Sequence, residues 1–348
     1  MRDTSDLNDR QKLILALVIN EYLENAQPVG SQHLVESYQL DFSAATVRNV
    51  MVDLTEAGFL RQPHTSAGRS PTEEGYRYFV RQLMGHTDLP ATTKRTITHQ
   101  FYQAGQDVNR WLRLAASVLA HQSQAASLVT RPRPDQAHFK HLELIATHGR
   151  QVLMVLVLSE GEVHQQMLSL AEPVPQERLS AAAIRINELC EGMDSFGIAR
   201  VQSMQTEALE QDVLKLVRDE MQRVERSIAS EVFRDGLSNV LSEPEFAEPE
   251  AARKALRALE EPPFLEDLLK RTLLNSSGDS VQVLIGGEGN WEELRECSMV
   301  LSRYGVPGHL TGAVAIIGPM RMPYGRSVSA VRFVSGLLSD LVVEMLAD

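Results

Sequence analysis

Four polar residues that can hydrogen-bond to nucleic acid lie within seven positions of this 348-residue chain. Arg48 can bind a guanine edge through two hydrogen bonds or clamp a phosphate, and Asn49 can pair with an adenine edge. Ser43 and Thr46 come just before them, and polar groups at the start of a helix suit a phosphate. The group therefore predicts contacts with double-stranded DNA if one helix carries all four side chains.

The residues around this group predict such a helix. Ser43 can cap it, Ala57-Gly58 can end it, and its apolar residues fall on one side. These inward-facing residues are Val47, Val50, Met51 and Leu54. A shorter helix over residues 31–38, capped by Ser31, precedes it after a four-residue turn. The pair matches a helix-turn-helix, whose second helix enters the major groove, although any small helical hairpin looks similar.

Flanking elements extend this unit in both directions. We expect a helix over residues 10–25, capped by Asp9, and a later helix from Glu73 to about Met84. Between them, two short strands around a loop rich in small hydrogen-bonding groups would form a wing. The candidate DNA contacts of the wing are Arg61, His64, Thr65, Ser66 and Arg69. They could lie along phosphates or reach a minor groove, and the alternative is a solvated hairpin loop.

The distribution of charge permits a DNA contact without requiring one. The whole chain carries 34 basic and 46 acidic side chains, a net charge of −12. Residues 42–84 carry 5 basic and 4 acidic side chains, whereas residues 141–348 carry 19 and 32. Because DNA affinity depends on the surface that meets phosphate, an acidic body is compatible with a locally neutral DNA-binding unit.

The remainder of the chain predicts a mixture of helices and strands. Helical patterns run to about Leu128, strands follow within residues 139–170, and Pro173 and Pro175 mark a boundary. The helices expected after that boundary are 176–191, 206–235, 248–260, 264–274 and 326–346. A second group of strands is expected within residues 280–318.

Composition and motifs exclude several other classes of protein. The longest apolar run has seven residues, Val152–Leu158, whereas a membrane span needs roughly 20. The N-terminus lacks the basic and then apolar pattern of a secretion signal, and two isolated cysteines, Cys190 and Cys297, suit a reducing cytoplasm. No catalytic triad, paired-acid pattern or metal-ligand spacing stands out. We therefore expect no enzyme activity, no cofactor and no metal.

Two segments near the C-terminus have alternative interpretations. Gly286-Gly-Glu-Gly289 follows a strand but lacks the spacing and the Lys-Ser/Thr ending of a phosphate loop. We interpret it as a turn at the exit of a strand. Residues 318–324, followed by Arg326, place two arginines near the start of a helix. This segment could bind an anion or an acidic partner, and we favour a structural corner or a domain contact.

Two longer signatures are distinctive as whole segments. The first is Phe42–Leu54 with Gly58–Tyr76, and the second includes Val283–Asn290, Cys297-Ser298, Tyr304 and Gly312–Tyr324. Their sequence, order and separation resemble the HrcA family of bacterial heat-inducible transcription repressors, and the resemblance covers nearly the whole chain. Ser70 departs from the larger apolar residue that the family often has, and Gly287 and Gly289 depart from its usual Gly-Glu-Asn.

The resemblance implies an α+β multidomain protein. The expected parts are a winged helix-turn-helix DNA-binding domain at 1–84, a helical linker region at 85–137, a GAF-like domain formed by 138–172 and 234–348, and an inserted, mostly helical dimerisation domain at 173–233. It also implies a homodimer that binds an inverted-repeat operator of chaperone operons, and a chaperonin that keeps it active until unfolded protein competes during heat shock. Two alternatives stay open: a winged-helix regulator that senses a small molecule, and an enzyme with an accessory winged unit.

Overall fold

The computed structural model divides the chain into two compact units. It describes residues 7–64, 68–85, 87–105, 107–134, 136–159, 161–226, 231–247, 250, 253–254, 256–257, 261, 280–286 and 294–347. Unit 1 comprises Met1–Arg131, Glu231–Tyr304 and Gly312–Asp348, and unit 2 comprises Pro132–Ser230 and Gly305–Thr311. Unit 2 is therefore inserted, in sequence, between parts of unit 1. Both units combine helices with antiparallel strand pairs.

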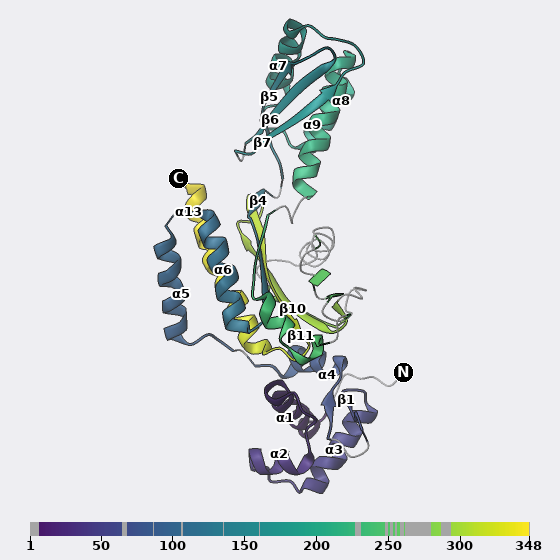
Figure 1. Ribbon diagram of the computed structural model, residues 1–348, viewed down its shortest axis with the longest axis vertical. Coiled ribbons are helices and arrows are strands. Elements are labelled where there is room, and N and C mark those ends of the chain that lie inside the picture. The colour runs from purple at the N-terminus through teal and green to yellow at the C-terminus, as the bar shows by residue number, and fades with distance from the viewer. Residues whose placement is uncertain are drawn as a thin grey trace. The chain divides into compact units, whose positions relative to one another are not determined.

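The N-terminal part of unit 1, here called the head, consists of the described residues up to 85. Its elements are α1 (Asp9–Asn25), α2 (Ser31–Tyr38), α3 (Ala44–Glu56), β1 (Leu60–Arg61), β2 (Ser70–Pro71), α4 (Glu73–Tyr78) and a π-helical turn, η1 (Phe79–Leu83). Helices α1 and α2 both pack on α3, and β1 pairs with β2 as an antiparallel hairpin (Figure 1). The expected three helices and hairpin are thus present.

Two of the expected helix caps are wrong. The N-cap of α1 is Asn8, whose side chain accepts the backbone N–H of Gln11 while Gln11 bonds back to the N–H of Asn8. This reciprocal capping box satisfies two backbone donors, so the helix begins one residue earlier and Asp9 lies inside it. The N-cap of α2 is Gly30, without a side-chain bond, and Ser31 is the first helical residue.

The rest of unit 1, here called the body, is a sheet covered by helices. Its helices are α5 (Ala91–Ala104), α6 (Val108–Ser123), α10 (Leu237–Leu241), the short 3-10 turn η2 (Pro244–Phe246) and α13 (Tyr324–Ala347). Its strands are β3 (Ala126–Thr130), β8 (Val232–Asp235), β9 (Gln282–Ile285), β10 (Cys297–Gly305) and β11 (Leu310–Pro319), in the order β8-β3-β11-β10-β9. Helix α6 packs against α13 and β3 (Figure 1). Every residue of β3 is buried, so both faces of this strand are covered.

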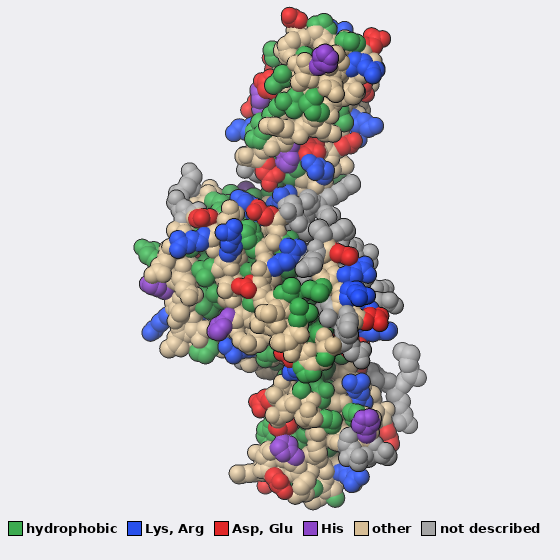
Figure 2. Space-filling view, in the orientation of Figure 1, with side chains coloured by type: hydrophobic (Ala, Val, Ile, Leu, Met, Phe, Trp, Pro, Cys, Tyr) green, Lys and Arg blue, Asp and Glu red, His purple; other side chains and the backbone are tan. Residues whose placement is uncertain are grey.

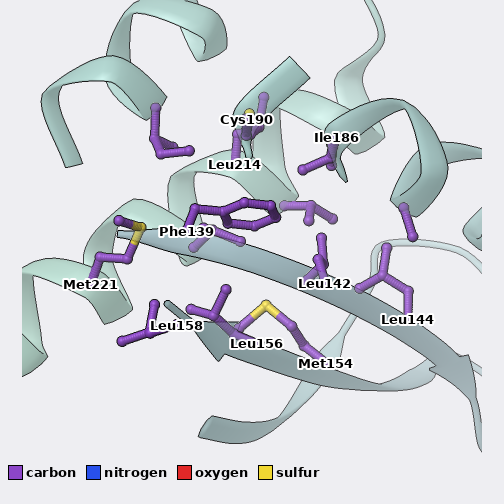
Figure 3. Close-up of a cluster of buried hydrophobic side chains, with 14 of the residues drawn as sticks. Phe139, Leu142, Leu144, Met154, Leu156, Leu158, Ile186, Cys190, Leu214 and Met221 are labelled. Carbon is purple, nitrogen blue, oxygen red and sulfur yellow. The ribbon is translucent and has the colours of Figure 1, made fainter. Parts of the chain in front are cut away.

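Unit 2 has its own sheet and its own hydrophobic core. Its elements are β4 (Arg133–Pro134), which pairs with the start of β11, β5 (Phe139–Ala146), β6 (Gln151–Leu158), β7 (Val163–Ser169), α7 (Gln176–Cys190), α8 (Ser195–Met204) and α9 (Ala208–Arg226). The antiparallel order is β5-β6-β7. One face of this sheet meets the helices, and Figure 3 shows Phe139, Leu156 and Leu214 in the core between them.

The division into domains differs from the expected one. Strands β5, β6 and β7 were expected to share a domain with residues 234–348, but β6 pairs with β5 on one side and with β7 on the other. The apolar face of this meander is covered by the helices that follow it in sequence, so the strands and helices fold as one unit. Pro175 is the N-cap of α7, and its fixed φ suits a helix entry. The prolines therefore mark a strand-to-helix turn rather than a domain boundary.

Two helices end earlier than expected. The helix expected over 206–235 ends at Arg226, and Val232–Asp235 forms β8, which pairs with β3. The helical pattern expected to about Leu128 ends at Ser123, and Ala126–Thr130 forms β3. Short apolar runs of this kind suit a buried helix and a buried strand equally, and pairing within the sheet decides between them. The helices expected at 248–260 and 264–274 lie almost wholly outside the described residues.

Candidate nucleic-acid interface

Helix α3 separates a buried face from an exposed one, as its sequence predicts. Its N-cap is Ser43, whose hydroxyl accepts the backbone N–H of Thr46 at 3.1 Å. All four residues expected to point inward are buried: Val47, Val50, Met51 and Leu54. Because α1 and α2 cover that side, the opposite side of α3 is left exposed.

The four candidate residues of α3 lie at its start and on this exposed side. Arg48 and Asn49 are exposed, and within the described residues neither has a hydrogen-bond or ion-pair partner. Thr46 is half-buried, and its hydroxyl lies 2.9 Å from the Ser43 hydroxyl. A guanidinium and an amide are therefore available to an external ligand beside a helix N-terminus, the arrangement that suits bases and phosphates.

A buried carboxylate on α1 fixes α2, the helix that leads into α3. Glu21 is 9% exposed, and its two oxygens accept hydrogen bonds from three side chains. The donors are His33 Nε2 at 2.7 Å, Asn25 Nδ2 at 2.7 Å and Tyr38 Oη at 3.2 Å. The hydrogen bond from His33 lowers the pKa of Glu21 more than burial raises it. The charged carboxylate is thus the form that holds the two helices together.

The hairpin after α3 is braced across its strands. Arg61 and Ser70 are register partners, and Arg61 Nε donates to Ser70 Oγ at 3.3 Å. His64 is exposed at the last described position before the loop. Thr65 and Ser66 lie outside the described residues, so their predicted DNA contacts stay predictions.

Arg69 contacts α3, an arrangement that its position in the loop did not indicate. Its Nε donates to Thr55 Oγ1 at 3.0 Å, and that hydroxyl donates to the Met51 carbonyl at 2.7 Å. Its backbone exchanges two hydrogen bonds with Val29, of 2.8 and 2.9 Å. Beside it, Gly68 lies so close to Val29 that an added Cβ would be 2.2 Å from the Val29 carbonyl oxygen. Arg69 therefore ties the hairpin to α3 and to the segment before α2.

Arg10 is a candidate that the sequence pattern missed. Its guanidinium carbon lies 4.8 Å from the centre of the Phe42 ring, in cation–π contact. Phe42 directly precedes the N-cap Ser43, so a second exposed cation is held near the start of α3. Only tertiary packing brings α1 to this point, so spacing within the sequence carries no signal for it.

Charge on the visible surface is mixed in sign. Figure 2 shows acidic and basic side chains interspersed on the face it displays, rather than a continuous basic band. Residues 42–84, which include α3 and the hairpin, carry 5 basic and 4 acidic side chains. A DNA contact by the head therefore depends on individual cations such as Arg48 rather than on a broad positive field.

Comparison with known proteins identifies the family. The model of the HrcA protein C terminal domain matches residues 109–328. A protein named heat-inducible transcription repressor HrcA, from Roseiflexus sp. (strain RS-1), is 47% identical over 349 residues, covering 98% of this chain and 96% of the relative. A protein of the same name from Herpetosiphon aurantiacus is 43% identical and covers 99% and 97%. The chain belongs to the HrcA family.

A solved structure supports the fold of this HrcA chain. It is described as a crystal structure of a hypothetical protein at 2.2 Å resolution, and it is 22% identical with a TM-score of 0.58. The match covers 97% of this chain and 99% of the other. Because the family model begins at residue 109, the assignment of the head to HrcA rests on the relatives that cover nearly the whole chain.

The departure from the HrcA pattern at Ser70 has a structural explanation. Ser70 is 2% exposed, and its hydroxyl accepts the hydrogen bond from Arg61. A small polar side chain thus replaces apolar volume with a bond across the hairpin. Gly287 and Gly289, the other departures, lie outside the described residues.

The two arginines near the start of α13 are engaged within unit 1. Arg321 is paired with Glu243 and Glu245, and Arg326 donates to Gln122 Oε1 at 3.2 Å. These contacts agree with the structural corner favoured from the sequence, and they leave less positive charge for an anion.

Other chemistry finds little support in the described part of the chain. There, no group of three or more His, Cys, Asp or Glu side chains could hold a metal ion. Burial raises the pKa of the Cys190 thiol to about 11 and that of Cys297 to about 12, so neither is primed as a nucleophile. No helix among the described residues combines the length and apolar character needed to cross a membrane.

Proposed function

We propose that this HrcA protein represses chaperone operons by binding an inverted-repeat operator as a dimer. One observation carries the proposal: α3 buries its apolar face and exposes Arg48 and Asn49. A helix-turn-helix needs such an exposed polar face to enter the major groove, and the hairpin would act as the wing. The names of the relatives add heat-inducible repression of transcription, and they do not favour the small-molecule alternative. The proposed place of action is the cytoplasm, where the operator is.

The polar residues of the head would divide between bases and phosphates. Arg48 and Asn49 would read base edges, while Ser43 and Thr46 would place a phosphate at the N-terminus of α3. Arg10, beside Phe42, would add a cation at the same point. The hairpin residues assigned to the DNA backbone are Arg61, His64, Thr65, Ser66 and Arg69. For Arg69 we add the bracing role that its bond to Thr55 indicates.

The dimer would form through the outer face of the unit 2 sheet. In β6 the residues between the core-facing ones, Leu153, Val155 and Val157, are also apolar and only half-buried. Three of their six neighbours across the strands are apolar and exposed by 44% to 55%, and two of these, Ile145 and Met167, flank Leu153, while Val163 flanks Val157. The other three neighbours are polar: His141, Glu143 and Gln165. An antiparallel sheet that faces water normally carries polar residues there. The apolar part of this outer face, around Leu153, fits instead a self-complementary contact with a second copy of the chain.

A charge placed in this face tests the dimer. Leu153→Lys should convert the dimer to a monomer in sedimentation velocity, because both neighbours of Leu153 across the strands are apolar and burying an unpaired ammonium in such a contact is unfavourable. The control is Thr206→Lys, which adds the same charge at an exposed position of unit 2. If Leu153→Lys sediments as the wild type does, this face is not the contact.

The chaperonin is the partner that we propose for regulation. It would hold the repressor in its active state, and unfolded protein would displace it on heating. Three apolar side chains on the helices of unit 2 are more than half exposed: Ile184 at 57%, Phe196 at 78% and Met204 at 71%. Exposed apolar surface is what chaperones engage, so these residues support the proposal. Purified chaperonin should raise the fraction of repressor that binds operator, and an unfolded competitor should reverse the gain.

Fluorescence anisotropy with two duplexes tests the central proposal. One duplex carries the inverted repeat of a chaperone operon, and the other has the same bases scrambled. At fixed salt we expect a specificity ratio on the order of a thousand, with one dimer per repeat. Equal binding to both duplexes, with and without added chaperonin, would reject a sequence-reading repressor.

A further inference from the structure

Helix α4, which directly follows the hairpin, is held by segments from the C-terminal half of the chain. Arg77 Nη2 donates to the backbone carbonyl of Ile285, the last residue of β9, at 3.2 Å. The rings of Tyr76 and Tyr324 have centroids 6.0 Å apart and are tilted by 52°. The two sequence signatures of this chain therefore meet here, since α4 ends the first and β9 and Tyr324 belong to the second.

The turn after β9 is fitted to one side chain of α4. Gly286 has a φ of +63°, and an added Cβ would lie 2.3 Å from Glu73 Oε1. Glu73 itself is ion-paired with Arg77. To admit a larger residue at position 286, the carboxylate would have to move, and the Glu73–Arg77 pair that leads to Ile285 would be disturbed. Glycine at this position thus protects a contact between the body and α4.

The same helix also holds the hairpin. Thr72, the N-cap of α4, follows β2 directly, and its hydroxyl donates to the Gly58 carbonyl at 2.6 Å. Its backbone N–H donates to the Phe59 carbonyl at 3.1 Å. A displacement of α4 would therefore reach both strands of the hairpin and the end of α3 that precedes them.

A second anchor lies after η1. Thr87 Oγ1 donates to the Gly325 carbonyl at 2.8 Å, and Ser329 Oγ donates to the Thr87 carbonyl at 2.7 Å. Both partners lie in the first turns of α13. The segment from α4 to residue 87 is thus fixed to the body at its two ends.

The contact between Tyr76 and Tyr324 includes a buried hydroxyl group that lacks a hydrogen bond within the described residues. Tyr76 is 3% exposed, and its hydroxyl has no hydrogen-bond partner within the described residues. Burial of a polar group without a partner is unfavourable, and native structures keep few such groups. The bonds of Arg77 and Thr87 to the body must therefore outweigh this cost for the junction to form.

We propose that the Ile285–Gly286 turn positions α4, and through it the hairpin, for binding to DNA. Arg77 and Glu73 are positioning residues in this scheme, because they touch the turn and not the operator. The sheet of the body would then set operator affinity at a distance from the bases. The proposal rests on the proposed function of the head, and it adds the route by which the body controls it.

Two glycine substitutions separate this route from simple backbone strain. Gly286→Ala introduces both an unfavourable φ and the collision with Glu73. Gly308→Ala introduces an unfavourable φ, +81°, with nothing within 4 Å of the added Cβ. We expect Gly286→Ala to weaken operator binding about tenfold more than Gly308→Ala does, as contacting residues couple on that scale. Equal losses in the two variants would overturn the proposal.

A double variant tests the collision itself. The three atoms nearest to the added Cβ all belong to the Glu73 side chain. Glu73→Ala removes them and leaves only the backbone strain, so in a Glu73→Ala background Gly286→Ala should weaken operator binding no more than Gly308→Ala does in the wild type. If the two losses simply add, the turn does not act through Glu73 and the proposal fails. If Gly286→Ala alone folds poorly, Glu73→Ala still tests the contact, because it removes the carboxylate that pairs with Arg77 beside the turn and should weaken operator binding by itself.

Hydrogen exchange of the full-length chain provides a readout that needs no DNA. Gly286→Ala should speed exchange of backbone amides in β1, β2 and α4, and Gly308→Ala should not. If wild-type protein does not distinguish operator from scrambled duplex, the proposed function fails, and exchange alone then decides on the positioning contact. Unchanged exchange in the hairpin and α4 would overturn it in either case.

Discussion

At the scale of single residues, Arg48 has the most specific expected effect. If it binds a guanine edge, Arg48→Ala should cost about 1–3 kcal/mol on operator and relax specificity at one base pair. A phosphate contact would instead weaken binding to all sequences and reduce the salt slope by roughly one. Because Arg48 lies on the exposed side of α3 and not at its first turn, we expect the former. Operator and scrambled duplexes titrated at two salt concentrations distinguish them.

A matched variant controls for the lost charge. Lys215→Ala removes one cation from an exposed position of α9 in unit 2. It should leave operator affinity unchanged at both salt concentrations. If Arg48→Ala behaves like Lys215→Ala, Arg48 does not belong to the interface.

Arg69 offers a test of bracing against direct contact. Its bond to Thr55 predicts that Arg69→Ala and Thr55→Val each weaken operator binding by a similar factor, and that the double variant is no worse than either. If bracing is the whole role of Arg69, the salt slope should not change, because no phosphate contact is lost. Anisotropy titrations of the three variants measure this. If Thr55→Val leaves operator affinity unchanged and Arg69→Ala reduces the salt dependence of binding, Arg69 contacts the DNA backbone instead.

Local residues were predictable where local rules apply. Ser43, Arg48 and Asn49 lie where the cap and the apolar spacing of α3 predicted, because both signals fall within one helix. The contact of Arg10 with Phe42 and that of Arg69 with Thr55 join residues of different elements. Sequence spacing has no information on such pairs, since they depend on how the helices pack.

At the scale of elements, the α1–α2 contact should weaken in acid. Because the fold lowers the pKa of Glu21 from its ordinary value of 4.5, its stabilising effect is complete above that value. It is lost as the pH falls through the lower value in the folded protein. With His33 half exposed, we expect a loss of about 1 kcal/mol. Amide protection factors in α2, measured at pH 6 and in steps below pH 4.5, report it.

Two variants that replace a carboxylate by a carboxamide test whether Glu21 causes this response to acid. Glu21→Gln should lower protection of α2 near neutral pH and remove most of its dependence on pH. Glu24→Gln changes an exposed residue on the same helix and should leave the response intact. A wild-type response that persists in Glu21→Gln would point to another group.

The sequence predicted correctly whether most elements are helices or strands. For some segments, however, only the pairing within the complete sheet decides between the two. The apolar residues of β3 and β8 fit the ends of helices equally well, and they became strands by pairing with each other and, for β3, with β11. For β6 the continuous apolar run predicted a strand correctly. That run also shows why its domain was misplaced: apolar residues on both faces do not reveal which elements cover them.

At the scale of the whole molecule, the arrangement of domains was the least predictable feature. The inserted segment was expected to begin near Pro173, whereas unit 2 begins at Pro132 and takes up residues 305–311 as well. A boundary between units is set by which surfaces bury each other, and distant strands such as β4 and β11 contribute to it. Proline positions mark turns, and a turn within a unit looks the same as a turn between units.

Half-site spacing tests the dimer and the positioning of its heads together. Inserting 5 base pairs between the half-sites turns one of them by about half a helical turn, so a symmetric dimer should lose specific binding. Inserting 10 base pairs restores the facing but adds roughly 34 Å, which only heads free to move apart could span. The head is anchored to the body by the bonds of Arg77 to Ile285 and of Thr87 to Gly325. We therefore expect the 10-base-pair insertion to abolish specific binding as well. The same insertions placed outside the repeat should be harmless in anisotropy titrations. Full affinity for the 10-base-pair insertion would show that the two heads of a dimer can move apart, either at the junction with the body or between units 1 and 2.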